Sequence, residues 1–208
     1  MSRILVIVAH PDLAHSRVAG AVMAAASAEG QAHDVELLDL YARYPDFLID
    51  SSAERARLAT VQLLVWVHPI HWYAMPPLMK LWLDEVLAFG WAYGPDGNAM
   101  RGRDLWLVTS TGGPQDSYHP TGYNRYDFDA FMPPYEQTAT LVGMRFLPPL
   151  VLHGAHRASD AEIADHAAVF ALRLRHYPDW PEIDGLADCA SCEVPGDARP
   201  VAPETIGS

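Results

Sequence analysis

The segment from His10 to Arg17 has the composition of an anion-binding loop. It runs into an Ala-rich stretch that favours a helix, and the free N–H groups at a helix N-terminus attract phosphate. Ser16 adds a hydroxyl there and Arg17 adds a positive charge. The alternative is that Ser16 only caps the helix while Arg17 faces solvent. Because the chain lacks G-x-G-x-x-G and G-x-x-x-x-G-K-[ST], it favours neither a dinucleotide fingerprint nor a nucleoside-triphosphate loop.

A second segment, Pro69–Pro76, places two adjacent aromatic residues, Trp72 and Tyr73, directly after an apolar run. A flat ring system could rest against such an aromatic wall. The alternative is that these aromatics only cover the core, as loop aromatics often do. We favour the binding interpretation because the segment falls at the predicted binding edge of the sheet described below.

A third segment, Thr111–Ala130, is long for a connection, and long loops in compact domains are often functional. Gly112 and Gly113 would let the backbone approach a ligand closely. Tyr118 and His119 are candidates for proton donation or hydrogen bonding. The alternatives are a packed loop aromatic for Tyr118 and a surface histidine for His119.

Apolar runs alternate with helical patterns, and this order predicts an α/β fold with a doubly wound parallel sheet and helices on both faces. Five strands rather than six favour a flavodoxin-like sheet over the dinucleotide-binding order. Ligands bind beyond the carboxyl ends of such strands, and the three segments follow the first, third and fourth strands. The expected strands are Arg3–Ala9, Asp34–Leu40, Gln62–His68, Asp104–Ser110 and Arg145–His153.

Local signals mark the helices between these strands. Two S-x-x-E patterns, which begin at Ser51 and Ser159, resemble capping boxes that open helices. Pro148 and Pro149 cannot donate to a strand ladder, so the fifth strand should be irregular or lie at an edge. The other expected helices are Ser16–Ala28, a helix with Pro76 and Pro77 in its first turn, and Phe131–Val142; the last helix runs from Ser159 to about Tyr177.

Charge divides the 208 residues into a domain over 1–177 and an acidic, Pro-rich tail over 178–208 that we expect to be poorly ordered. Cys189 and Cys192 lie in that tail without a second cysteine pair, so no structural zinc site is expected.

The net charge of −12 disfavours nucleic-acid binding. The sequence has no apolar run long enough to span a membrane and no signal-peptide pattern, which predicts a cytoplasmic protein.

Several motifs together resemble the flavodoxin-like NAD(P)H:quinone oxidoreductases. Within that family the chain is most similar to the ancillary subunits of bacterial glutathione-gated potassium efflux systems. The resemblance covers residues 1 to about 177. The matching motifs are AHP at Ala9–Pro11, LYxxYPDFxID at Leu40–Asp50, VWxHPxxWYxxPPLxKLWxDxV at Val65–Val86, GWAYG at Gly90–Gly94, TGG at Thr111–Gly113 and LPP at Leu147–Pro149.

The resemblance implies a bound flavin, FMN with FAD as the alternative, together with NAD(P)H as co-substrate and a quinone as the acceptor of two electrons in a ping-pong reaction. Tyr118 and His71 are the implied catalytic donors that stabilise the reduced flavin. The implied flavin-binding residues are His10, Ser16 and Arg17 at the phosphate end, Pro69, Ile70, His71, Trp72 and Tyr73 along the ring system, and Thr111, Gly112 and Gly113 on its other side.

Three positions depart from the pattern of the family. Ala19 stands where an asparagine is common, His71 where a glutamine is common, and Asn124 where the mammalian enzymes carry the histidine that partners the tyrosine. The first change could weaken flavin retention. The other two leave open both the path of the proton and the preferred quinone.

The resemblance also implies partners. Relatives are generally homodimers, and Phe89–Tyr93 could face a second copy or pack over its own chain. An alternative function is a regulatory subunit that binds a potassium/proton antiporter, which would bring the chain to the inner membrane through that partner. A one-electron carrier like flavodoxin is disfavoured, because the aromatic second segment and the long third segment suit substrate capture.

Overall fold

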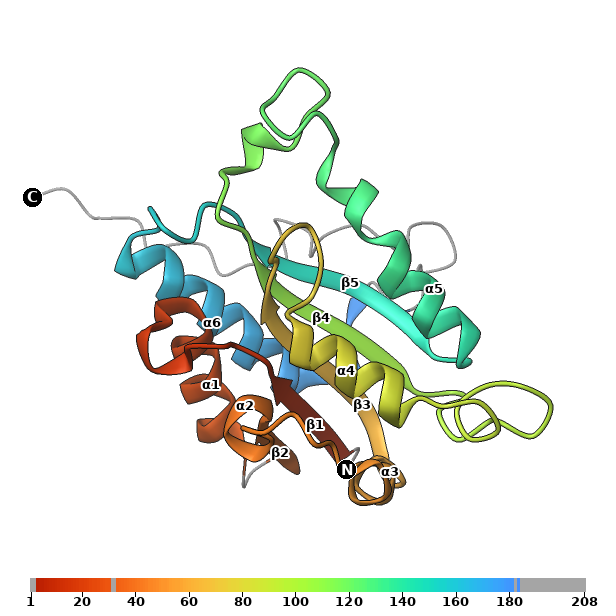
Figure 1. Ribbon diagram of the computed structural model, residues 1–208. Helices are drawn as coiled ribbons and strands as arrows, with labels where there is room; N and C mark the ends of the chain where they lie inside the picture. Colours follow the sequence, from red (N-terminus) through yellow and green to blue (C-terminus); the bar gives the residue numbers. More distant parts are fainter. Residues whose placement is uncertain (1–2, 31–32, 182, 184–208) are drawn as a thin grey trace, which may run out of the picture.

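A five-stranded parallel sheet forms the centre of the computed structural model, which describes residues 3–30, 33–181 and 183. The strand order is β2-β1-β3-β4-β5, so the predicted flavodoxin-like, doubly wound sheet is confirmed (Figure 1). Each expected strand appears within one residue of its predicted ends. The strands are β1 (Arg3–Val8), β2 (Val35–Asp39), β3 (Val61–Pro69), β4 (Asp104–Ser110) and β5 (Arg145–Leu152).

Helices cover both faces of the sheet and bury the two largest apolar clusters, one on each side. The helices α1 (Arg17–Glu29) and α6 (Asp160–His176) lie side by side on one face. The other face is covered by α2 (Leu40–Arg43), α3 (Ser51–Leu58), α4 (Pro77–Val86) and α5 (Pro133–Leu141). Short 3₁₀ turns stand at Leu13–His15, Gln115–Ser117 and Phe128–Phe131. Within the described residues no helix is long and apolar enough to cross a membrane.

Only one of the two predicted capping boxes forms. At α6 the Ser159 hydroxyl accepts from the Glu162 N–H at 3.2 Å, and the Glu162 carboxylate accepts from the Ser159 N–H at 2.7 Å. At α3 the prediction is wrong, because Asp50 caps the helix by accepting from the Ala53 N–H at 2.9 Å. Glu54 is thereby free to turn away from the helix end and into the protein.

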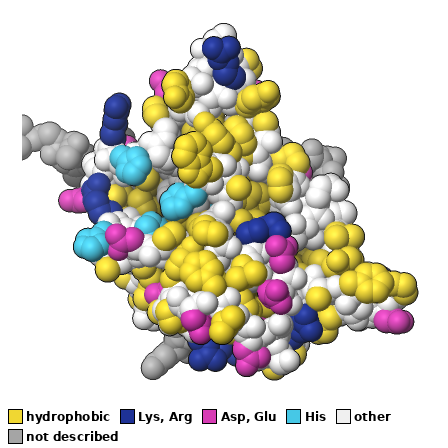
Figure 2. All heavy atoms as spheres, in the orientation of Figure 1, with side chains coloured by type: hydrophobic (Ala, Val, Ile, Leu, Met, Phe, Trp, Pro, Cys, Tyr) yellow, Lys and Arg dark blue, Asp and Glu magenta, His cyan; other side chains and the backbone are white. Residues whose placement is uncertain are grey.

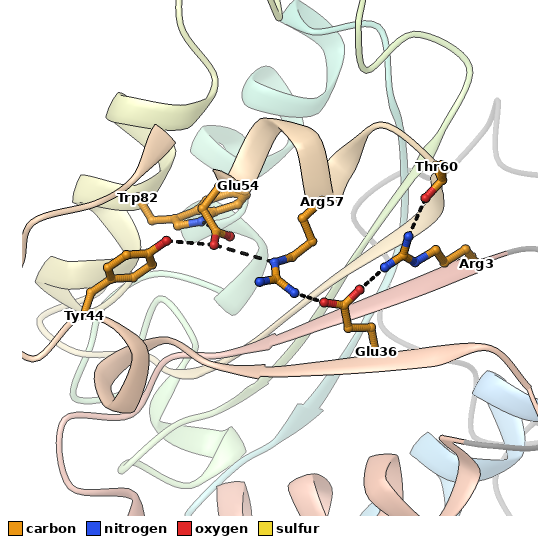
Figure 3. A network of polar contacts seen from close by, with 7 residues as sticks. All are labelled: Arg3, Glu36, Tyr44, Glu54, Arg57, Thr60 and Trp82. Atoms are coloured by element: carbon orange, nitrogen blue, oxygen red, sulfur yellow. Dashed lines mark hydrogen bonds and ion pairs between the residues drawn. The ribbon is translucent and has the colours of Figure 1, made fainter. Parts of the chain in front are cut away.

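Glu54 is completely buried and gathers polar partners from three helices (Figure 3). Its carboxylate accepts a hydrogen bond from the Tyr44 hydroxyl at 2.8 Å and one from the Trp82 indole N–H at 3.1 Å. The Arg57 guanidinium lies 3.6 Å from Glu54 and also pairs with Glu36, which in turn pairs with Arg3. This network ties α3, α4 and the residue that follows α2 to the strand β1 and the edge strand β2.

Replacing Glu54 with alanine should lower the free energy of unfolding by about 2–4 kcal/mol, because the buried Tyr44 and Trp82 donors lose their acceptor. Glu54→Gln keeps one acceptor oxygen and should cost less. Urea unfolding of the two variants measures the difference. A loss below about 0.5 kcal/mol in both variants would show that the network does not stabilise the fold.

The packed domain extends past its predicted boundary at residue 177. Trp180 is only 4 % exposed, and its ring contacts Trp106 edge-on with centroids 4.9 Å apart. Its indole N–H donates to the carbonyl of Arg173 at 2.8 Å. The boundary therefore falls later than the acidic composition indicated. Cys189, Cys192 and the rest of the predicted tail lie outside the described residues.

The fifth strand carries the irregularity that its prolines predict. β5 is an edge strand, and its register with β4 shifts between Trp106 and Val108. The Trp106 indole N–H donates to the carbonyl of Pro148 at 3.0 Å, a hydrogen bond that joins the two strands at this irregularity. The strand then continues to Leu152, which brings the residues after it to the same edge as the three predicted binding segments.

Candidate active site

The three predicted segments meet at the carboxyl edge of the sheet. The turn after β3 and the long loop after β4 rise together from this edge (Figure 1). Two pockets open between the segments, with volumes of about 390 Å³ and about 370 Å³, and Ile70 lines both. We call them the histidine pocket and the tyrosine pocket. Figure 2 shows histidine side chains gathered on the α1 side of this edge, next to hydrophobic side chains.

The two pockets contain every residue that the sequence predicted for the site, except the alternative donor His119. The histidine pocket is lined by His10, Ser16, Arg17, Pro69, Ile70, His71, Thr111 and Gly112, together with Asp12, His15, Val18, Ser110, Ala155 and His156. The tyrosine pocket is lined by Ile70, Trp72, Tyr73, Gly113 and Tyr118, together with Pro114, Ser117, Tyr123 and Asn124. His119 is exposed, and its ring bonds to Thr121 in its own loop at 2.9 Å.

The N-terminus of α1 contributes to the histidine pocket. The Ser16 hydroxyl caps the helix by accepting from the Ala19 N–H at 3.2 Å. His10 lies opposite His71, with ring centroids 6.3 Å apart. Burial lowers the pKa of His10, and the neighbouring His71 lowers it further, while Asp12 opposes the shift. A bound anion would favour the charged form of His10.

Arg17 lines the histidine pocket but is already engaged with the start of α6. Its guanidinium donates to the carbonyl of Ala158 at 2.9 Å and to the carboxylate of Asp160 at 2.6 Å. Two of its three nitrogens are thus taken by groups in the chain itself. Arg17 therefore joins α1 to α6, a role that the sequence did not indicate.

Trp72 and Tyr73 form a tight turn whose aromatic side chains face outward. The turn is closed by mutual hydrogen bonds between the backbones of His71 and Ala74, at 2.9 and 3.0 Å. Both central residues have positive φ, 50° and 65°, which is unfavourable for bulky side chains. Trp72 is 93 % exposed, so it does not cover the core. Tyr73 is held by stacking on Phe131, with centroids 5.2 Å apart.

Asn124 links the turn after β3 to the long loop after β4. Its side-chain carbonyl accepts from the Tyr73 hydroxyl at 3.3 Å, and its amide donates to the Ser117 hydroxyl at 3.2 Å. Gly113 lies beside this link, and a Cβ there would sit 2.7 Å from the Ser117 hydroxyl oxygen. A side chain at position 113 would therefore push the Ser117 hydroxyl away from this link.

Tyr118 stands between the tyrosine pocket and the core. Its ring packs edge-on against Phe128 and Phe131, with centroids 5.5 and 6.0 Å apart. Burial raises the pKa of the Tyr118 phenol, while a hydrogen bond with Thr111 acts in the opposite direction. Tyr118 therefore keeps its proton at neutral pH and faces a partner able to stabilise its anion.

The sequence analysis missed the contribution of the segment after β5. His153 contacts Tyr118 and Thr111, and His156 lines the histidine pocket. The same rule that selected the other segments applies here, because a residue that follows a parallel strand lies at its carboxyl edge. Applied to the fifth strand, that rule would have identified both histidines.

His68, at the end of β3, is buried directly beneath this edge. It is 1 % exposed, donates through Nδ1 to the carbonyl of Pro69 at 3.0 Å, and stacks on Tyr135 with centroids 5.7 Å apart. Its Nε2 has no hydrogen-bond partner among the described residues. Burial lowers the pKa of His68 from 6.5 to about 4. The imidazole is therefore neutral in the folded protein at neutral pH.

Acidification should weaken the fold through His68. The unfolded chain protonates this histidine near pH 6.5 and the folded protein only near pH 4, so the unfolded state binds more protons in between. Stability is lost as the pH falls through this interval, by about 2 kcal/mol between pH 7 and pH 5. His68→Phe keeps a ring against Tyr135 and should remove that loss of stability. Urea unfolding of both proteins at pH 7 and at pH 5 measures the difference. Equal losses in both proteins would contradict the assignment.

Comparison with known proteins shows the family to which this chain is related. A family model described as flavodoxin-like fold matches residues 2–174. The glutathione-regulated potassium-efflux system ancillary protein KefF of Klebsiella pneumoniae (strain 342) is 42 % identical over 180 residues, which are 86 % of this chain and 97 % of the relative.

Two solved structures are similar along most of their length. General stress protein 14 of Treponema denticola, in complex with FMN, is 35 % identical, with a TM-score of 0.78 over 83 % of this chain and 98 % of that one. An NADPH-quinone reductase of P. pentosaceus is 25 % identical, with a TM-score of 0.72 over 81 % and 95 % of the two chains.

Proposed function

This chain belongs to the family with the flavodoxin-like fold, and on that premise we propose that it is an FMN-dependent NAD(P)H:quinone oxidoreductase. The observation that carries the proposal is the convergence of the twelve residues implied for flavin binding and catalysis on two adjoining pockets. An FMN complex and an NADPH-quinone reductase among the similar structures support the same chemistry.

The chemistry of the histidine pocket fits the phosphate end of FMN. The N-terminus of α1 supplies free N–H groups, and imidazole side chains that can donate hydrogen bonds to a phosphate line the pocket at His10, His15, His71 and His156. A terminal phosphate satisfies this site, whereas FAD would have to extend a second phosphate and an adenosine beyond it. We therefore infer FMN as the cofactor, with Ser16 and His10 as its principal phosphate contacts.

The tyrosine pocket fits a flat ring system and a second flat substrate above it. Trp72 and Tyr73 form one wall, and Gly113 and Tyr118 form the other. The flavin, when bound, accepts a hydride from NAD(P)H and delivers two electrons to a quinone. Tyr118 and His71 hold protons where negative charge develops. A pocket that NAD(P)H and the quinone occupy in turn gives ping-pong kinetics.

A second function is favoured by the relationship to KefF, whose name describes an ancillary protein of a potassium-efflux system. In this alternative the chain binds a potassium/proton antiporter at the inner membrane, and reduction of quinones is secondary. A homodimer suits either function. Phe89 is 69 % exposed and Tyr123 is 89 % exposed, so both are available to a second copy.

The deciding experiment is an absorption spectrum of the purified protein after incubation with FMN and desalting, followed by anaerobic addition of NADPH. We expect flavin to be retained and its visible absorption to bleach, and a quinone to restore it. Loss of flavin on desalting would overturn the proposed enzymatic function. Co-purification with the cytosolic domain of an antiporter, without quinone turnover, would favour the regulatory alternative.

A further inference from the structure

We propose that Tyr73 presents a hydrogen-bond acceptor to the tyrosine pocket and thereby recognises a donor on the flat ring that occupies this pocket. The proposal rests on the function given above and adds the chemistry that one wall of the pocket selects. It follows from the direction of a chain of hydrogen bonds, which runs along the pocket from Tyr73 into the long loop after β4.

The chain of hydrogen bonds joins four residues, and all four line the tyrosine pocket. The Tyr73 hydroxyl donates to the side-chain carbonyl of Asn124 at 3.3 Å, and the Asn124 amide donates to the Ser117 hydroxyl at 3.2 Å. The Ser117 hydroxyl in turn donates to the carbonyl of Pro114 at 2.7 Å. Every donated proton therefore points away from Tyr73 and toward the backbone of the loop.

The Ser117 hydroxyl fixes this direction because it has a single proton. Its oxygen lies 2.7 Å from the carbonyl oxygen of Pro114, a distance at which a proton must lie between the two, and only the hydroxyl can supply it. The Ser117 oxygen must then accept from Asn124, which turns the amide nitrogen toward Ser117 and the amide oxygen toward Tyr73. An amide oxygen only accepts, so the phenol proton of Tyr73 is directed at Asn124.

The Tyr73 oxygen keeps its capacity to accept a hydrogen bond. A phenol donates once and can also accept. Its proton is committed to Asn124, and among the residues that the structure describes no other group forms a hydrogen bond with this oxygen. Tyr73 is 46 % exposed and lines the pocket, so a ligand there can reach the oxygen and meets a lone pair rather than a proton.

Both ends of the bond between Tyr73 and Asn124 are held in place. The φ of Tyr73 is 65°, a conformation that is unfavourable for a bulky side chain and persists only where the surroundings fix it. Stacking on Phe131, with centroids 5.2 Å apart, holds the Tyr73 ring. The Asn124 N–H donates to the carbonyl of Ser117 at 3.0 Å, which anchors the other end. The direction of the phenol proton is therefore set before a ligand arrives.

The other residues of the pocket determine what kind of donor fits. Among the described residues that line it there is no Asp, Glu, Lys, Arg or His. An ammonium group would lose its water there without gaining an opposite charge. The pocket therefore suits a neutral amide or hydroxyl donor on a flat ring. In the proposed reaction two groups have this chemistry, the carboxamide of NAD(P)H and the hydroxyls of the hydroquinone product.

The quinone itself carries only acceptors, so Tyr73 should not bind it. A carbonyl oxygen that faces Tyr73 would meet a second lone pair, whereas Tyr118 on the other wall has a proton to offer. We therefore expect the quinone to turn its reacting carbonyl toward Tyr118. The two phenols have opposite hydrogen-bonding roles, and this difference distinguishes a quinone from a ring that bears a donor.

The first test measures the direction of the chain in the protein free of flavin. Hydrogen exchange of the Asn124 side-chain amide is followed by NMR, and its signals are assigned by their loss in Asn124→Asp. Ser117→Ala should speed this exchange by about fivefold, because the amide loses the group to which it donates. Tyr73→Phe should leave the exchange unchanged, because Tyr73 bonds to the amide oxygen and not to the nitrogen.

The opposite pattern would overturn the proposal. Faster exchange in Tyr73→Phe, or exchange that Ser117→Ala does not affect, would mean that the amide does not donate toward Ser117 and that the phenol proton is free to face the pocket. Tyr126→Phe is the matched control, because Tyr126 belongs to the same loop, is 62 % exposed and lines neither pocket. Its exchange pattern should be that of the wild type.

The second test measures recognition in the FMN-loaded protein. NADH is compared with its 3-acetylpyridine analogue, in which a methyl group replaces the NH₂ of the carboxamide. Tyr73→Phe should raise the KM for NADH by about fivefold and leave the KM for the analogue unchanged. Hydroquinone and its dimethyl ether, each used as an inhibitor, provide the same comparison for the product.

The results separate the two sources of the donor. An effect on NADH alone assigns the donor to the carboxamide, an effect on hydroquinone alone assigns it to the product, and an effect on both shows that Tyr73 binds each in turn. No effect on either ligand, or loss of flavin from Tyr73→Phe, would overturn recognition by Tyr73. Failure of the wild type to retain flavin would instead overturn the proposed function, and the exchange pattern would still decide whether Tyr73 presents an acceptor.

Discussion

Replacing Ser16 with aspartate should nearly abolish FMN binding while leaving the fold as stable as before. Aspartate caps helices as well as serine does, so the bond to the Ala19 N–H is retained. Its negative charge would lie against the flavin phosphate. Two like charges about 4 Å apart at the protein surface cost about 4 kcal/mol, or about a thousandfold in affinity. Fluorescence titration with FMN and thermal unfolding measure the two effects.

Riboflavin is the control for this experiment, because it carries the same ring system without the phosphate. Its affinity should be the same for the wild type and for Ser16→Asp. Ser16→Thr, which keeps both the hydroxyl and the cap, should bind FMN normally. If Ser16→Asp binds FMN as tightly as the wild type, then the phosphate does not lie at the N-terminus of α1 and the assignment of the histidine pocket is wrong.

Reduction of the bound flavin by NADPH should slow by about a hundredfold in Tyr118→Phe. A positioned proton donor contributes about this much or more to such reactions, because it stabilises charge as it develops. Phenylalanine keeps the ring that packs against Phe128 and Phe131, so FMN should remain bound. Anaerobic stopped-flow spectroscopy measures the rate, and desalting followed by an absorption spectrum measures flavin retention.

Tyr126→Phe is the matched control for Tyr118→Phe. Tyr126 belongs to the same loop but is 62 % exposed and does not line either pocket. Loss of the Tyr126 hydroxyl should leave the rate of flavin reduction unchanged. A Tyr118→Phe rate equal to that of the wild type would remove Tyr118 from the mechanism.

Much of the fold can be predicted from local pattern because its determinants are close together in the chain. Apolar runs such as Arg3–Ala9 form strands that are buried on both faces, and the two prolines at 76 and 77 begin α4 as their fixed backbone geometry requires. The position of the site follows from the same reasoning. Parallel strands share a carboxyl edge, so the segments after β1, β3 and β4 had to meet.

The partners of individual polar side chains depend on packing between elements that are distant in sequence. Glu54 fits a capping box by spacing, but α3 packs so that its carboxylate meets Tyr44 and Trp82. Arg17 has the charge to bind phosphate, yet the approach of α6 gives it Asp160. Trp180 lies in an acidic stretch, but burial against Trp106 outweighs that composition.

The sequence by itself determined that the segments after β1, β3 and β4 gather at one edge of the sheet, because the alternation of strands and helices follows from short-range patterns. Only the tertiary structure decided which of those residues touch. Thr111 and His153 directly follow different strands, and a shift of β5 by one residue would turn each of its side chains to the opposite face. Contacts of this kind depend on register and packing, which the whole fold sets cooperatively.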